Sequence, residues 1–200
     1  MSWSLVQLEE ICEINIGKTP SRSNSSYWGG EEPWLSISDM NQGKTFFQTK
    51  EKITFKAIKE CNMKIVVPGT VLFSFKLSIG KVGRTSIPMY TNEAIASLPI
   101  KNENLIDPRY LMYYLKEIAP NLTGDRAVMG ATLNKQKLKE IKISLPPVNE
   151  QRRIAKILDQ STNLQIKQNA LKKTLLNLEK NIFVDFFGDP LFNPKSLPLV

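Results

Sequence analysis

The sequence predicts an α+β protein: a mixed, β-rich domain with short helices, followed by one long C-terminal coiled-coil helix. Short segments rich in β-branched and aromatic residues, separated by turn residues, occupy most of residues 1–148. A heptad pattern of apolar residues then takes over after the pair Pro146-Pro147. We therefore expect a folded domain over residues 1–148, a helix over 149–187, and a linker into a further repeat over 188–200.

Composition excludes many classes of protein. The chain has 200 residues, 42% of them hydrophobic, with two cysteines and a net charge of +8. Histidine is absent, so the commonest general base, the commonest zinc ligand and every Ser-His or Cys-His pair are excluded. The positive charge suits a polyanionic partner such as DNA, although a basic protein without such a partner has the same composition.

The sequence also predicts where the protein is located. The longest apolar run, residues 63–75, is interrupted by Lys64, Pro68 and Gly69 and is too short to span a membrane. Glutamates stand near the N-terminus, where a signal peptide would have a basic start and an apolar stretch. Two cysteines do not make a disulfide framework. We therefore expect a cytoplasmic protein that is not bound to a membrane.

The sequence predicts one helix, one loop and one strand in the first 50 residues. A short N-terminal helix is expected from the helical spacing of Leu5, Leu8, Ile11 and Cys12. A polar loop rich in Ser, Asn and Gly follows at 17–30. The alternation of apolar and polar residues at 34–37 then predicts a strand.

The sequence of residues 54–100 predicts a short helix and several strands. Thr54 is expected to cap a helix over 55–59. Residues 63–67 and 70–75 are rich in β-branched and aromatic side chains around the turn Pro68-Gly69, and predict a pair of strands. Further strands are expected at 81–87 and 94–100.

The sequence of residues 107–145 predicts two helices and a last strand. Asp107 followed by Pro108 is typical of a helix start, and Pro120 is expected to end that helix. Leu138 and Ile141 predict a short amphipathic helix. Residues 142–145 predict the last strand, before the proline pair.

The long helix carries a narrow apolar seam. Asn149 is expected to cap its start, and Gly188 with Pro190 to end it. The seam residues alternate spacings of three and four for about four heptads: Ile154, Ile157, Ser161, Leu164, Gln168, Leu171, Leu175, Leu178 and Ile182. A partner helix is the favoured interpretation, and packing of the helix on its own domain is the alternative.

Three motifs suggest a catalytic or cofactor-binding site, and the first two are rejected. Gly17-Lys18-Thr19 lacks the glycine that a phosphate-binding loop needs five residues earlier, where Cys12 stands. The segment 145–148 lacks the flanking polar and aromatic residues of an amino-methyltransferase site, and no glycine-rich nucleotide-binding turn accompanies it. No cofactor is therefore expected. Asp125, Glu140 and Lys142 fit a metal-dependent nuclease loosely, and surface charge accounts for them better.

Donor-rich loops remain as candidate DNA-binding residues, because Lys, Arg, Asn and Ser contact phosphates and base edges. We expect these loops to have no packing role. The candidates fall in three loops: Lys18, Thr19, Ser21, Arg22, Asn24, Ser25 and Tyr27 in the first, Lys76, Ser78, Lys81 and Arg84 in the second, and Arg126 and Lys135 in the third. Trp28 and Trp34 are interpreted as packing aromatics.

An ordered set of short motifs resembles a known family. The motifs are Gly17-Lys18-Thr19-Pro20-Ser21, Tyr27-Trp28-Gly29-Gly30, Pro33-Trp34-Leu35 with Ser38-Asp39, Pro68-Gly69-Thr70-Val71-Leu72, Ser78-Ile79-Gly80-Lys81, and Leu145-Pro146-Pro147 with Glu150-Gln151. Together they look like the target recognition domain and following helix of the specificity subunit of type I restriction-modification systems. The resemblance covers nearly the whole chain.

The resemblance implies a function and a set of partners. A typical subunit of that family has two recognition domains and two helices, so this sequence is similar to half a subunit. The family recognises double-stranded DNA without catalysis, while methyltransferase and restriction subunits supply methylation and cleavage. Its two helices pack antiparallel, which implies that this chain forms a homodimer or pairs with a second recognition half. A nuclease and a structural coiled-coil adaptor are the alternatives.

Overall fold

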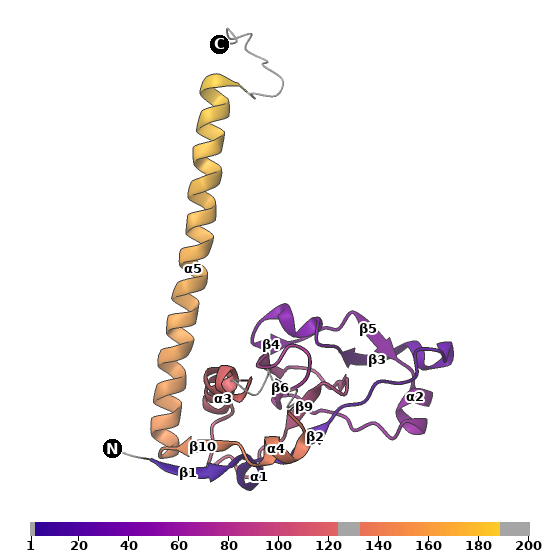
Figure 1. Ribbon diagram of the computed structural model, residues 1–200. Helices are drawn as coiled ribbons and strands as arrows, with labels where there is room; N and C mark the ends of the chain where they lie inside the picture. Colours follow the sequence, from indigo (N-terminus) through magenta and orange to yellow (C-terminus); the bar gives the residue numbers. More distant parts are fainter. Residues whose placement is uncertain (1–2, 124–132, 189–200) are drawn as a thin grey trace. The chain divides into compact units, whose positions relative to one another are not determined.

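The computed structural model describes residues 3–123 and 133–188 (Figure 1). Its Cα positions divide the chain into two compact units, residues 1–155 and 156–200. The first unit contains every β-strand of the described residues, and the second contains most of one long helix.

A five-stranded sheet forms the centre of the first unit, in the order β2-β9-β6-β7-β4. The strands are β2 (Asn15–Ile16), β4 (Thr45–Phe46), β6 (Val71–Ser74), β7 (Val82–Thr85) and β9 (Ile95–Leu98). Every residue of β6 and β9 is buried, because both faces of these central strands are covered. The pairings are antiparallel except that of β4 with β7.

Two smaller sheets complete the β structure. One has the order β5-β3-β8, with β3 (Trp28–Leu35), β5 (Glu51–Ile53) and β8 (Tyr90–Thr91). The other pairs β1 (Ser4–Gln7) with β10 (Lys142–Leu145) in antiparallel register. Strands from the two ends of the first unit therefore lie side by side.

Short helices connect and cover the sheets. They are α1 (Leu8–Ile11), α2 (Phe55–Glu60), α3 (Pro108–Thr123) and α4 (Lys135–Lys139), with 3-10 turns η1 (Ser25–Tyr27) and η2 (Asp39–Gln42). Side chains cap several helix starts, which satisfies N–H groups that have no partner within the helix. Thr54 Oγ1 accepts from Ala57 N at 3.3 Å, and Asp107 Oδ1 accepts from Arg109 N at 2.9 Å.

The main hydrophobic core joins α3 to the central strands. Phe73 of β6 and Leu98 of β9 are fully buried, as are Leu111 and Leu115 on the inner face of α3 and Ile143 of β10. The hydroxyl of Tyr110 donates to the Ser144 carbonyl at 2.8 Å, and burial raises the pKa of this phenol to about 12. The tyrosine therefore stays neutral and ties α3 to β10.

Local sequence signals predicted many of these elements. The helix after Thr54, the strands within 81–87 and 94–100, the helix containing Leu138 and the strand at 142–145 are confirmed. The end of the long helix is confirmed too, since Gly188 has φ +82° and donates to the Val184 carbonyl at 2.8 Å. Pro190 lies outside the described residues.

Four predictions of structure were wrong. Residues 4–7 form β1 rather than helix, because they pair with β10. Residues 63–67 contribute one isolated bridge, Val66 to Met89, rather than a strand. Pro120 lies inside α3, which continues to Thr123. The long helix begins at Val148, so Asn149 is not its cap.

The long helix α5 (Val148–Phe187) begins within the first unit. Gln151 is fully buried there: its Oε1 accepts from Asp107 N at 2.9 Å, and its Nε2 donates to the carbonyls of Leu105 at 2.8 Å and Pro146 at 2.7 Å. Ala155 is also buried, and Ile154 packs against the main core. The first two turns of α5 are therefore part of the domain, and Ile154 contributes to its core.

Further along α5, the apolar seam is exposed. Gln168 is exposed as well. Six apolar seam side chains have between 48% and 66% of their surface accessible: Ile157, Leu164, Leu171, Leu175, Leu178 and Ile182. None of the helices in the described residues is both long and apolar enough to cross a membrane.

Candidate nucleic-acid interface

The first predicted loop, residues 17–30, is held by contacts within the protein. The guanidinium of Arg22 lies 3.7 Å from the centre of the Trp28 ring and pairs with both carboxylate oxygens of Glu51, one of them at 2.9 Å. This hydrogen bond lowers the pKa of the Glu51 carboxyl and raises that of Arg22. Arg22 therefore joins the loop to β5.

Other candidates of this loop also have partners. Lys18 Nζ donates to the Cys61 carbonyl at 2.8 Å, and Thr19 Oγ1 donates to the Glu93 carboxylate. Tyr27 donates to Glu60 at 2.7 Å, which raises the pKa of the phenol. The expectation that this loop has no packing role is wrong for these side chains.

The remaining candidates of the loop are small and polar. Asn24 Oδ1 accepts from Ser26 N at 3.1 Å and starts the turn η1, in which Ser25 is exposed. Ser21 Oγ lies 2.8 Å from Ser23 Oγ. The Trp28 indole donates to the Ser21 carbonyl at 3.1 Å, and these contacts together give the loop a fixed backbone.

The second predicted loop connects β6 to β7. Lys81 Nζ donates to the Ile37 carbonyl at 3.0 Å, and the Ser78 carbonyl accepts from Ser74 Oγ at 2.5 Å. Arg84 lies in β7, where its backbone N–H donates to the Lys44 carbonyl at 2.8 Å. Lys76 is exposed. This loop is therefore fixed against the segment after β3.

The third predicted loop lies elsewhere. Lys135 is exposed at the start of α4, and α4 is joined to α1 by the ion pair of Lys139 with Glu9 at 2.9 Å. Figure 1 draws α4 next to α1. Lys135 therefore lies on a helix that packs against α1, which belongs to neither of the other two loops. Arg126 lies outside the described residues.

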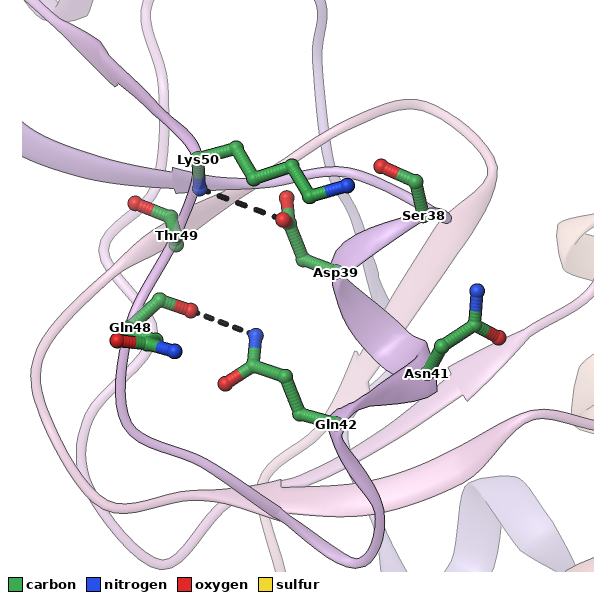
Figure 2. Close-up of a pocket in the computed structure, with 7 residues that line it drawn as sticks. All are labelled: Ser38, Asp39, Asn41, Gln42, Gln48, Thr49 and Lys50. Atoms are coloured by element: carbon green, nitrogen blue, oxygen red, sulfur yellow. Dashed lines mark hydrogen bonds between the residues drawn. The ribbon is translucent and has the colours of Figure 1, made fainter. Parts of the chain in front are cut away.

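A polar depression of about 510 Å³ lies beside segments that the other two loops contact, and of its lining residues the sequence motifs had named only Ser38 and Asp39. Its walls are residues 38–42, around η2, and residues 48–50, before β5 (Figure 2). Lys81 contacts Ile37 next to one wall, and Arg22 contacts Glu51 next to the other. The signal in the sequence was the density of amide and hydroxyl side chains in Asn41-Gln42 and Gln48-Thr49.

Of the residues considered for a nuclease, Glu140 and Lys142 lie within the described part of the chain. Glu140 ends α4 and accepts from Gln136 at 2.8 Å, Lys142 lies in β10, and Asp125 is outside the described residues. Within residues 3–123 and 133–188, no three acidic, His or Cys side chains gather as a metal site would require. Burial raises the pKa of the Cys12 thiol to about 12, so this thiol is not a nucleophile at neutral pH.

The family model for the "Type I restriction modification DNA specificity domain" matches residues 1–178. The chain belongs to this family. The resemblance read from the short motifs is thereby confirmed, and so is the α+β fold with a long C-terminal helix.

Relatives of the chain are specificity subunits. The MjaIX specificity subunit of Methanocaldococcus jannaschii is 32% identical over 197 residues, which cover 92% of this chain and 44% of that protein. The EcoR124I/EcoR124II specificity subunit of Escherichia coli is 28% identical over 166 residues, covering 78% of this chain and 40% of that subunit. The chain thus spans less than half the length of these relatives.

Solved structures of related chains have a similar fold. The HsdS subunit from Thermoanaerobacter tengcongensis has a TM-score of 0.65 at 27% identity, with 86% of this chain and 40% of that chain covered. A chain from a study of assembly and conformational transition of the type I restriction-modification system has a TM-score of 0.69 at 25% identity, with 90% and 42% covered.

Proposed function

We propose that this chain recognises one half of a bipartite sequence in double-stranded DNA and has no catalytic activity of its own. The family match over residues 1–178 carries the proposal. Methylation and cleavage would come from methyltransferase and restriction subunits that assemble with it. A cytoplasmic location fits its two free cysteines, Cys12 and Cys61.

The polar loops on the first unit support this function. Lysines and arginines on a fixed backbone release counterions from phosphates, and amide or hydroxyl groups read base edges. Arg22 and Lys81 contact segments next to the walls of the polar depression, whereas Lys135 lies on α4, which is paired with α1. We therefore assign the main reading surface to the first two loops and to the segment between them.

Selection from a pool of randomised DNA duplexes tests the function. The full chain, alone and with its methyltransferase subunit, should enrich one defined sequence, and its affinity should fall steeply as salt is raised. Enrichment of no sequence, with affinity independent of salt, would favour a structural adaptor. Cleavage of DNA with magnesium that is lost in Glu140→Ala would favour a nuclease.

We also propose that α5 pairs with a second helix. The six exposed apolar seam residues from Ile157 to Ile182 form a stripe that is costly in water. A second copy of the chain is the favoured partner, since its seam has the same spacing. The main competitor is a different specificity polypeptide, and a helix packed on its own domain is the lesser one.

Helix pairing has a geometric consequence for the DNA site. From Ile154 to Ile182 the helix rises about 42 Å. In an antiparallel pair, the two domains would then be separated by more than one turn of DNA, about 34 Å. A homodimer should therefore recognise an interrupted palindrome with half-sites roughly one helical turn apart.

Light scattering measures the pairing directly. The unmodified chain should have the mass of a dimer at micromolar concentration, and the double variant Leu171→Glu, Leu175→Glu the mass of a monomer. Asn163→Glu with Asn177→Glu is the matched control, because it adds the same charge to exposed positions outside the seam. A monomeric unmodified chain, or a dimer unaffected by both seam charges, contradicts the proposal.

A further inference from the structure

We infer that the polar depression between residues 38–42 and 48–50 is a base-reading site for the major-groove edge of a purine, with Asn41 and Gln48 as the reading residues and Lys50 as a phosphate contact. This inference rests on the proposed DNA-recognition function and assigns residues to it. Neither Asn41, Gln48 nor Lys50 was singled out by the sequence motifs.

The frame of the depression is held rigidly from inside. Asp39 is 2% exposed, and its carboxylate accepts from Ser36 N at 2.9 Å, Ser36 Oγ at 2.7 Å and Lys50 N at 3.3 Å. Gln42 Nε2 donates across the depression to the Gln48 carbonyl at 2.8 Å (Figure 2). Two hydrogen bonds thus tie one wall to the other, and less entropy is lost when a ligand binds a fixed frame.

The outer side chains of this frame are available for a ligand. Asn41, Gln48 and Lys50 are exposed, and within the described residues none of their side chains forms a hydrogen bond or ion pair. In the neighbouring loop, by contrast, Lys18 and Arg22 are both engaged by protein groups. The depression therefore offers two amides and a lysine that are not engaged by protein groups.

The types of residue favour a base edge over other DNA features. Asn and Gln side chains form paired hydrogen bonds with the N6 and N7 atoms of adenine, whereas phosphate contacts need only positive charge or a donor. No aromatic side chain lines the depression, so stacking of unpaired bases is not favoured. The carboxylate of Asp39 is occupied within the protein, which leaves amides and one lysine for the DNA.

The position of the depression supports the same ligand. Lys81 donates to the Ile37 carbonyl beside one wall, so a cationic side chain stands there, and the charge of Arg22 beside the other wall is neutralised by Glu51. A base edge in the depression would have a neighbouring phosphate on the side of Lys81. Lys50, at the rim, would contact the phosphate closest to the base that is read.

Selection from the randomised duplex pool, with the full chain, tests the assignment. Asn41→Ala and Gln48→Ala should each leave one position of the enriched sequence undefined, with affinity for the original sequence lowered roughly ten- to hundredfold. Gln48→Glu should shift the preferred base toward cytosine, because a carboxylate accepts from cytosine N4. Lys50→Ala should weaken binding to all sequences and lower the salt slope by about one.

Matched controls are available on the same domain. Asn104→Ala removes an exposed loop amide and Lys56→Ala an exposed lysine, and both should leave the enriched sequence unchanged. Circular dichroism checks that each variant is folded. If Asn41→Ala and Gln48→Ala, both folded, enrich the original sequence at unchanged affinity, the assignment is overturned while the proposed function stands. If the unmodified chain enriches no sequence, the proposed function fails and the assignment fails with it.

Discussion

The domain and the long helix differ in how far they bury their leucine side chains. In the domain, Leu72 of β6 is fully buried between neighbouring strands, whereas Leu171 of α5 is 60% exposed. The domain has a buried core of its own, although Phe55 and Leu77 are exposed on it, whereas the later turns of α5 bury none of their apolar seam. The difference supports the proposal that the later turns of α5 pair with a second helix, which would cover their apolar stripe.

The largest expected effect comes from making one substitution in both regions. Leu72→Ala should lower the free energy of unfolding by about 2–5 kcal/mol, because it leaves a cavity in a packed sheet. Leu171→Ala should change it by less than about 0.5 kcal/mol in the dilute, dissociated chain. Urea unfolding followed by fluorescence checks both, since all three tryptophans lie in the domain. Equal effects would mean that Leu171 packs on its own domain.

A smaller effect is expected in the first turns of α5, where the helix passes from its buried part to its exposed part. Gln151→Leu leaves the Asp107 N–H and the carbonyls of Leu105 and Pro146 without partners, at a cost of about 1–3 kcal/mol. Gln165→Leu, on the exposed part of the same helix, should cost almost nothing. Thermal unfolding of both variants measures the difference, and a harmless Gln151→Leu would show that the first turns of α5 are not anchored by this amide.

The smallest effect concerns the surface of the domain, where Arg22 and Glu51 are both about half exposed. The pKa of the Glu51 carboxyl is lowered in the folded state, so the ion pair stabilises the fold above the pKa of the unfolded chain and is lost as pH falls through the folded pKa. Glu51→Gln should therefore cost under about 1 kcal/mol at neutral pH and nothing well below about pH 4.

Glu31→Gln serves as the control for this pH dependence, because Glu31 is 95% exposed and 3.8 Å from Lys52. Urea unfolding at several pH values should separate the two variants near neutral pH only. A difference that persists in acid would show that Glu51 acts through packing rather than through its charge.

Local chemistry decided which parts of the fold could be predicted. The caps at Thr54 and Asp107, and the glycine at 188, act on neighbouring residues and were read correctly. The strand β1 was not, because its partner β10 lies more than 130 residues away. Pro120 was misread for a similar reason: burial of Leu115 and Ala119 on the inner face of α3 offsets the backbone hydrogen bond that proline forfeits.

The candidate site shows the same limit. Composition located the polar loops, and the motifs located the family. The hydrogen-bond partners of Lys18, Arg22 and Tyr27 lie 29 or more residues away in sequence, so no local pattern could show that these side chains were hydrogen-bonded. The motifs named Ser38 and Asp39, but the amides of residues 41–48 were overlooked because they gain significance only when the two walls meet.

The pairing of β1 with β10 places the points where the chain enters and leaves the domain next to each other. The chain enters it at Ser4–Gln7 and leaves it at Lys142–Leu145, and these strands are hydrogen-bonded neighbours in register from Ser4 with Leu145 to Gln7 with Lys142. Entry and exit points this close tolerate insertion and circular permutation. Recombination within the two strands would therefore replace everything from Leu8 to Ile141 while leaving the sequence of α5 unaltered, and under the proposed function one such exchange would change the DNA sequence that is recognised.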